Sequence, residues 1–150
     1  LARDIADSYK ADLGVGVGAN EIVTQESKFS VDETVSRLKA LLGERDVPVF
    51  ATFDHGENAR RAGMDLRPTK VVVFGNPKVG TKLMQSSQAV ALDLPLRLSV
   101  WEDERGRVWV GYQAMERLAA EYNVKDTAAV LAVERMLEAL VAKTVNVYDY

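Results

Sequence analysis

Residues 96 to 112 constrain the fold of this chain most, because two runs of alternating side chains flank a short polar turn. The apolar residues at every second position are Leu96, Leu98 and Val100 before the turn, and Val108, Val110 and Tyr112 after it. Such alternation predicts two strands that each bury one face. A three-residue loop at 104–106, with Gly106 in the left-handed conformation, places Val100 opposite Val110 and keeps both apolar rows together. The same antiparallel register places Trp101 opposite Trp109 on the other face.

Two long amphipathic helices are predicted, one on each side of this hairpin in the sequence. Ser30 and Glu33 form a capping box at the start of the first helix, and Gly43 is expected to end it. Its apolar stripe consists of Val31, Val35, Leu38, Leu41 and Leu42. Asp126 or Thr127 caps the second helix. Its stripe consists of Val130, Val133, Leu137, Leu140 and Val141.

Shorter elements complete the pattern. Strands are predicted at residues 21–27, 47–53 and 70–74, and short helices at 58–62 and 115–122. Pro48 indicates that its strand lies at a sheet edge or has just begun, and the unbroken apolar run at 70–74 is typical of a strand covered on both faces. Asn76 and Pro77 suit the N-cap and the first position of a helix, with Thr81 as a rival start.

These elements predict an α+β fold, in which a mainly antiparallel sheet carries the two long helices on one face. Residues 20–150 are expected to form a single domain, and residues 1–19 an N-terminal extension. Within that extension we predict a short helix at 1–13 and a flexible glycine-rich linker at 14–18. Residues 144–150 fit either a closing strand or a tail.

The composition argues against several classes of function. A net charge of -3, from 19 basic and 22 acidic residues, gives no footprint for nucleic-acid binding. No apolar run approaches the roughly 20 residues of a membrane span. The absence of cysteine removes disulfides and thiolate chemistry, and it fits either the cytoplasm or the periplasm. The glycines at 14–18 precede no predicted helix, so they fail the context of a dinucleotide-binding loop, and no cofactor is predicted.

Several short motifs together resemble one known family. They are Phe53-Asp54-His55, the run from Gly63 to Pro68, the run from Phe74 to Lys78, Gly80-Thr81 with Leu83-Met84, and the run from Leu92 to Leu96. Over residues 21–143 the chain resembles the bacterial domain-of-unknown-function family 302, with Met64 where leucine is expected. The resemblance implies a TATA-binding-protein-like arrangement, β-α-β(3-4)-α, and frequent self-association. It implies no established activity.

The first candidate site is Asp54-His55-Gly56, directly after a predicted strand. His55 is the only histidine, and it is the side chain best suited to proton transfer near neutral pH. One interpretation is an enzyme in which His55 is a general base oriented by Asp54, with an anion stabilised by Asn76 or Lys78. The other is structural: Asp54 caps the next helix and His55 bonds to backbone. The spacing of the acidic residues selects no metal ion, so no metal site is predicted.

The second candidate site is the segment 75–82, where a helix start would present free amides, Lys78 and Lys82 to an anion. The alternative is that the segment only begins a helix and that its lysines are solvated. Both candidate segments follow strands predicted to be neighbours, so we expect them to line one cleft for a small anionic ligand. The predicted lining residues are Asp54, His55, Asn76, Lys78 and Thr81.

The face that carries Trp101 and Trp109 is the candidate interface. Two exposed tryptophans form an apolar patch of the kind that marks interfaces. Since both long helices are needed on the other face, we predict contact with a second copy rather than cover by the same chain. The sequence therefore predicts a homodimeric binding domain for a small molecule or anion. An enzyme and a protein–protein interaction module are the alternatives.

Overall fold

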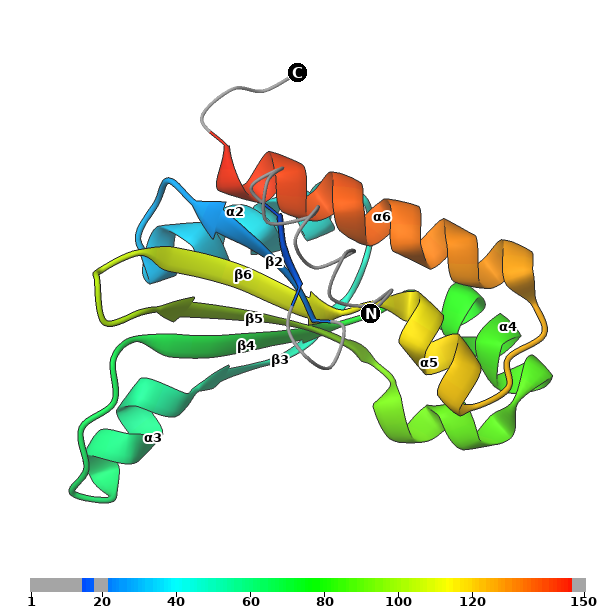
Figure 1. Ribbon diagram of the computed structural model, residues 1–150, viewed down its shortest axis with the longest axis horizontal. Helices are drawn as coiled ribbons and strands as arrows, with labels where there is room; N and C mark the ends of the chain where they lie inside the picture. Colours follow the sequence, from blue (N-terminus) through cyan, green and yellow to red (C-terminus); the bar gives the residue numbers. More distant parts are fainter. Residues whose placement is uncertain (1–14, 18–21, 147–150) are drawn as a thin grey trace, which may run out of the picture.

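The computed structural model describes residues 15–17 and 22–146, and within them six strands form one sheet (Figure 1). The strands are β1 (Val15–Val17), β2 (Ile22–Ser27), β3 (Val49–Asp54), β4 (Thr69–Phe74), β5 (Leu96–Glu102) and β6 (Val108–Gln113). Their order across the sheet is β1-β2-β6-β5-β4-β3. Every neighbouring pair is antiparallel. Strand β3 therefore lies at an edge of the sheet.

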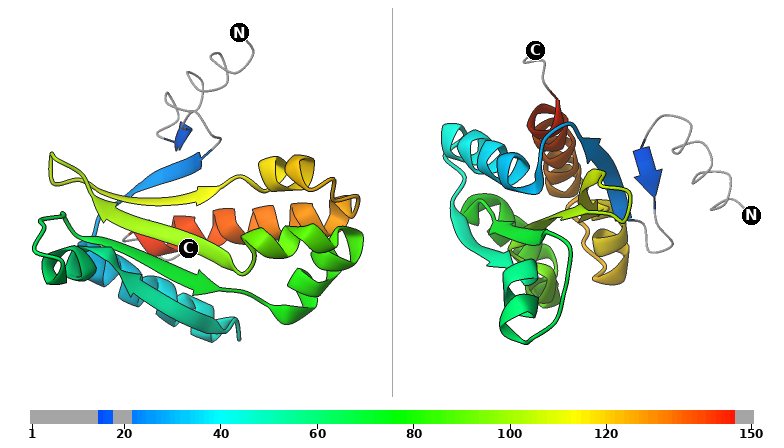
Figure 2. Two further views of the ribbon diagram at one scale, coloured as in Figure 1. Left: turned by 90° about the horizontal axis from the view of Figure 1, so that it is seen from below. Right: turned by 90° about the vertical axis from the view of Figure 1, so that its left-hand side faces the viewer.

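The long helices α2 (Val31–Glu44) and α6 (Thr127–Val145) lie on one face of the sheet (Figure 2). The shorter helices are α3 (His55–Arg61), α4 (Pro77–Ser86), the 3-10 helix η1 (Gln88–Asp93) and α5 (Met115–Glu121). Side chains from the sheet and both long helices meet in a core that includes Leu38, Leu42, Val72, Phe74, Leu98, Val100, Val110, Leu137 and Leu140. Removal of these side chains from water drives the packing. The predicted α+β class, with both long helices on one face of the sheet, is confirmed.

The hairpin of β5 and β6 has the predicted register. Val100 pairs with Val110, and Trp101 pairs with Trp109. Gly106 has a φ of +77, which is the left-handed conformation expected of the loop. The valines are buried under the helices, and the tryptophans are half-buried on the opposite face. The alternation of side chains was therefore enough to fix this register.

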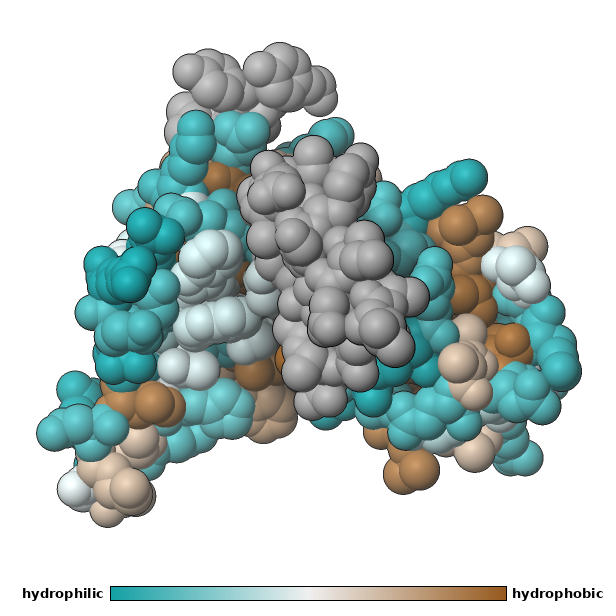
Figure 3. Space-filling model, viewed as in Figure 1, coloured by the Kyte–Doolittle hydropathy of each residue, from teal (hydrophilic) through white to brown (hydrophobic). Residues whose placement is uncertain are grey.

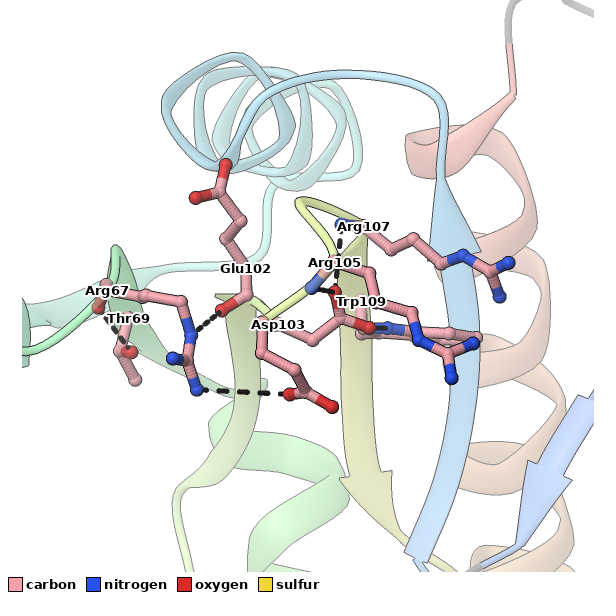
Figure 4. A network of polar contacts seen from close by, with 8 residues as sticks. Arg67, Thr69, Glu102, Asp103, Arg105, Arg107 and Trp109 are labelled. Carbon is pink, nitrogen blue, oxygen red and sulfur yellow. Dashed lines mark hydrogen bonds and ion pairs between the residues drawn. The ribbon is translucent and has the colours of Figure 1, made fainter.

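Asp103 holds the turn of the hairpin together (Figure 4). Its Oδ1 atom accepts the backbone N–H groups of Arg105 and Arg107, both at 2.9 Å. Its Oδ2 atom accepts the indole N–H of Trp109 at 2.9 Å. One carboxylate therefore couples the conformation of the loop to the orientation of a tryptophan on the strand.

The helix caps largely follow the prediction. The Ser30 Oγ atom accepts a backbone N–H at 3.1 Å at the start of α2. The Asp126 Oδ1 atom accepts one at 3.0 Å at the start of α6, so Asp126 rather than Thr127 is the cap. The prediction that Gly43 ends α2 is wrong, because the helix continues one residue further, to Glu44. The left-handed residue after it is Asp46, with a φ of 54.

Two strands test the predictions for the sheet. The edge position of β3 agrees with the indication from Pro48. In β4, Val72 and Phe74 are buried beneath the helices, but Val71 and Val73 are only half-buried on the other face. The prediction that this strand is covered on both faces is therefore wrong among the described residues. The reason is that α2 and α6 both pack on the same side.

The chain termini differ from the prediction in part. Strand β1 pairs with β2, so a strand lies within the segment 14–18 that was predicted to be a linker. The helix predicted at 1–13 lies outside the described residues, as do residues 147–150. Thr144 and Val145 belong to α6, so no closing strand begins there. The division of the chain at residue 19 stays a prediction.

The contact between Trp101 and Gly111 gives a first testable prediction. A Cβ atom added to Gly111 would lie 2.8 Å from two carbons of the Trp101 ring. We expect Gly111→Ala to lower the free energy of unfolding by about 1–3 kcal/mol, because the ring must leave its place. Denaturant unfolding followed by tryptophan fluorescence measures the loss. In a Trp101→Leu background the same change should cost much less, and an equal cost in both backgrounds would contradict this contact.

The turn gives a second prediction, for the pH dependence of stability. The hydrogen bond from Trp109, together with the two backbone N–H bonds, lowers the pKa of the Asp103 carboxyl. A carboxyl whose pKa is lower in the folded state stabilises the fold above its ordinary pKa, and that contribution is lost as the pH falls through the folded value. We therefore expect the free energy of unfolding of Asp103→Asn to fall less than that of the wild type from about pH 5 downward. Denaturant unfolding measures the free energy of unfolding of both proteins at each pH. If it falls equally in the two proteins as the pH is lowered, the Asp103 carboxyl does not contribute to the pH dependence of stability.

Candidate functional site

The two candidate segments lie at opposite ends of the sheet (Figure 1). Asp54, at the end of β3, pairs with Lys70 at the start of β4. Val49, at the start of β3, pairs with Phe74 at the end of β4. A strand of this length separates its ends by roughly 15–20 Å. The prediction of one cleft lined by both segments is wrong, because β3 and β4 run in opposite directions and their last residues lie at opposite ends of the sheet.

Asp54 has a structural role in the first segment. Its Oδ1 atom accepts the backbone N–H of Glu57 at 2.9 Å and so caps α3. Its Oδ2 atom lies 3.6 Å from the Lys70 Nζ atom, which is 2.8 Å from the Asp32 Oδ1 atom. The backbone hydrogen bond from Glu57, with help from Lys70, lowers the pKa of Asp54. The hydrogen bond to Asp32 raises the pKa of Lys70.

His55 is exposed and stacks on a neighbouring ring. The centroids of the His55 and Phe53 rings are 6.4 Å apart, with an interplanar angle of 16°. The Asp54 carboxylate binds Glu57 and Lys70 instead of orienting the imidazole. Asn76 and Lys78, the groups predicted to stabilise an anion, lie at the other end of β4. The proposed arrangement of a general base facing these two residues is therefore not formed.

A depression of about 400 Å³ surrounds the first segment, and its charged residues are mostly acidic. These residues are Asp32, Asp54, Glu57, Asp65 and Glu102, with Arg60 and Lys70 as the basic members. An excess of carboxylates repels an anionic ligand. In the part of the chain that the structure describes, no group of three or more acidic, histidine or cysteine side chains could hold a metal ion.

The second segment forms the predicted helix start. The Asn76 Oδ1 atom accepts the backbone N–H of Lys78 at 2.9 Å, and Pro77 is the first residue of α4. Thr81 lies inside the helix, so it is not the start. The side chains of Lys78 and Lys82 are exposed. The helix start therefore places its two lysines in solvent.

A groove of about 440 Å³ lies beside this helix, and we call it the α4 groove. It is bounded by β3, α4, η1, the start of β5 and α6. Among its apolar lining residues are Val47, Phe50, Leu83, Met84, Leu94, Val133 and Met136. Asn76 and Thr81 are the only polar side chains that line it, among the described residues, and none that line it is charged. Lys78 does not line it.

Most of this groove was missed by the analysis of the sequence. Val133 and Met136 contribute to it from α6, far from α4 in the chain, and Leu94 contributes from the residue that follows η1. Val133 belongs to the apolar stripe of α6, where it is indistinguishable from a core residue. Met136 lies beside that stripe, and this widening of the apolar face is the one signal that could have indicated a second apolar contact.

The two tryptophans are partly covered within the chain. Trp101 lies against Gly111, and Trp109 donates to Asp103. Both side chains are half-buried. Their assignment to a dimer interface stays a prediction.

The arrangement of sheet and helices agrees with comparisons to known proteins. The family model of Domain of unknown function DUF302 matches residues 23–144, and the chain belongs to this family. The crystal structure of an uncharacterized conserved DUF302 protein from Bacillus stearothermophilus superposes with a TM-score of 0.73 at 22% sequence identity. That match covers 82% of this chain and 97% of the other, and it shows the shared fold.

Curated relatives of this chain are named as ion channels. The chain is 38% identical over 129 residues to proteins named fluoride-specific ion channel FluC 1 from Brucella suis biovar 1 and Brucella abortus biovar 1. The match covers 86% of this chain but 49% and 46% of those proteins. The chain therefore spans about half the length of these relatives. No helix among the described residues is long and apolar enough to cross a membrane.

The capping role of Asp54 gives a third prediction. We expect Asp54→Ala to lower the free energy of unfolding by about 1 kcal/mol, because α3 loses its cap. Hydrogen exchange of the Glu57 amide should become faster in the variant. Asn76→Ala, the matched change at the start of α4, should speed exchange in α4 and leave α3 unchanged. If either variant exchanges faster in both α3 and α4, the two ends of the sheet are not structurally independent.

Proposed function

We propose that this protein is a small-molecule-binding domain and that its ligand occupies the α4 groove. The observation that supports this proposal most is the groove itself. Its volume of about 440 Å³ is within the range of small-molecule sites. Its lining is almost wholly apolar with two polar side chains, Asn76 and Thr81, which is also typical of such sites. The ligand class that fits is an uncharged, mainly apolar molecule with one or two hydrogen-bonding groups.

The lining supports a neutral ligand better than the anion predicted from the sequence. An anion would lose its hydration in the groove without gaining a charged partner there. The Asn76 Oδ1 atom is occupied by the helix cap, which leaves its amide nitrogen as a donor. The Thr81 hydroxyl can donate or accept. Met84 and Met136 have flexible side chains that adapt to the shape of an apolar ligand.

The Brucella relatives are named fluoride-specific ion channels, so fluoride serves as the control ligand for this proposal. A fluoride ion is small and strongly hydrated, and a groove without cations offers it no compensating charge. We therefore expect sodium fluoride neither to bind the isolated domain nor to displace a neutral apolar probe.

A pair of glycine variants tests the site. Gly80 lines the groove within α4, and a Cβ atom there would be 3.9 Å from Met84 and 4.0 Å from Leu94. Gly80→Leu should therefore fill the groove and lower the affinity for the neutral probe N-phenyl-1-naphthylamine at least about tenfold, equal to 1.4 kcal/mol. Gly43→Leu in α2 is the matched control, because a Cβ atom there meets nothing within 4 Å. Fluorescence titration measures both affinities.

The same titration can contradict the proposal. Probe binding that is absent in the wild type, or equally strong in Gly80→Leu, would show that the groove is not the site. Gly80→Ala serves as the folding control. It should bind the probe and gain about 0.5–1 kcal/mol of stability, because alanine favours the helix.

A further inference from the structure

Strands β5 and β6 separate at the end of the sheet that leads into α5. Their last pair in that direction is Ser99 with Gly111, and residues 96–98 of β5 and 112–113 of β6 lie beyond it. Each strand stays paired on its other side, β5 with β4 and β6 with β2. The two strands diverge toward α5, and α6 is visible between them (Figure 2). The sheet is therefore open at this point.

A cavity of about 430 Å³ occupies this opening, and we call it the β5–β6 slot. Its mouth is lined by the polar side chains of Arg97, Ser99 and Gln113. Alternation along the strands places these side chains on the same face of the sheet as Trp101, which also lines the slot. Its inner end reaches the buried side chains of Met115, Leu118 and Leu137. An apolar cavity with a few polar groups is the usual form of a small-molecule site.

The polar groups at the mouth offer mainly hydrogen-bond donors. The Gln113 Oε1 atom accepts from Arg117 at 2.7 Å, so its amide nitrogen remains as a donor. Arg97 contacts the described part of the chain through one side-chain nitrogen, which lies 3.4 Å from the Asp93 Oδ1 atom. The Asp93 Oδ2 atom accepts the Tyr122 hydroxyl at 2.6 Å. The acidic side chain is therefore engaged within the protein, whereas several donors remain for a ligand.

The charge at the mouth is presented by Arg97. Arg97 and Asp93 are the two charged residues that line the slot among the described residues, and their side chains are 53% and 20% exposed. The planar fork of a guanidinium matches the two oxygens of a carboxylate, and the ring of Trp101 offers a flat apolar surface beside it. We propose that the β5–β6 slot binds a small aromatic carboxylate. The ligand ring lies between Trp101 and the apolar inner end, and its carboxylate accepts from Arg97 and Gln113.

The other two cavities suit this ligand less well. The α4 groove offers a carboxylate no charged partner among the described residues. Apolar surface also gathers around α3 (Figure 3), but the charged residues of the depression there are mostly acidic and repel a carboxylate. The β5–β6 slot and the α4 groove share the lining residue Leu96. The inference nevertheless goes beyond the proposed function and does not depend on the ligand of the α4 groove.

Isothermal titration calorimetry of the full chain with 2-naphthoate tests the proposal, and 2-naphthamide is the matched neutral probe. The wild type should bind 2-naphthoate at least about tenfold more tightly than 2-naphthamide, because Arg97 forms charge-assisted hydrogen bonds with the carboxylate alone. Arg97→Gln should remove this preference. Arg67→Gln is the matched control and should keep it. The Arg67 side chain is 55% exposed and bonds to the Glu102 carbonyl, at the other end of β5.

Two further variants locate the ligand within the molecule. Ser99→Leu should fill the mouth of the slot and weaken the binding of both probes at least about tenfold. Gly80→Leu, which fills the α4 groove, should leave 2-naphthoate binding unchanged. Thermal unfolding of each variant establishes that the fold is intact. The proposal is overturned if the wild type does not bind 2-naphthoate, if it binds both probes equally, or if Gly80→Leu or Arg67→Gln weakens 2-naphthoate as much as Arg97→Gln does.

Discussion

Antiparallel hydrogen bonding between neighbouring strands determines where each polar segment of this protein lies. Strands β3 and β4 are antiparallel neighbours, so the segments that follow them lie at opposite ends of the sheet. Strand β3 ends at Asp54 and leads to α3 and an acidic depression. The segment after β4 contains Asn76 and leads to α4 and an apolar groove. The molecule therefore has two ends of different chemistry.

The length of α6 creates the groove at the second end. Its 19 residues extend about 28 Å at 1.5 Å per residue, whereas the strands beneath it span roughly 20 Å. The helix therefore continues beyond the sheet and contacts α4 and α5. At its other end, the Arg37 guanidinium of α2 donates to the carbonyls of Lys143, Thr144 and Asn146 at 2.9–3.0 Å. These bonds satisfy the last carbonyls of the helix and hold it against α2.

Local interactions made much of the fold predictable. The register of the hairpin follows from the alternation around Val100 and Val110, and Asn76 caps α4 because its side chain reaches an amide two residues away. The proposed cleft failed because its location depended on strand direction, which neither segment encodes locally. The groove escaped notice because Leu94 and Val133 are apolar residues like those of the core. Only the tertiary arrangement leaves a space between them.

The proposed ligand site lies at the α4 end of the sheet and is separate from the segment around Asp54. Titration of uniformly nitrogen-15-labelled protein with N-phenyl-1-naphthylamine, followed by amide chemical shifts, tests this directly. The account predicts saturable shifts at residues 75–84 and in the adjoining turn of α6, with the amides of α3 unmoved. Shifts centred on α3, or spread evenly over both ends, would contradict it.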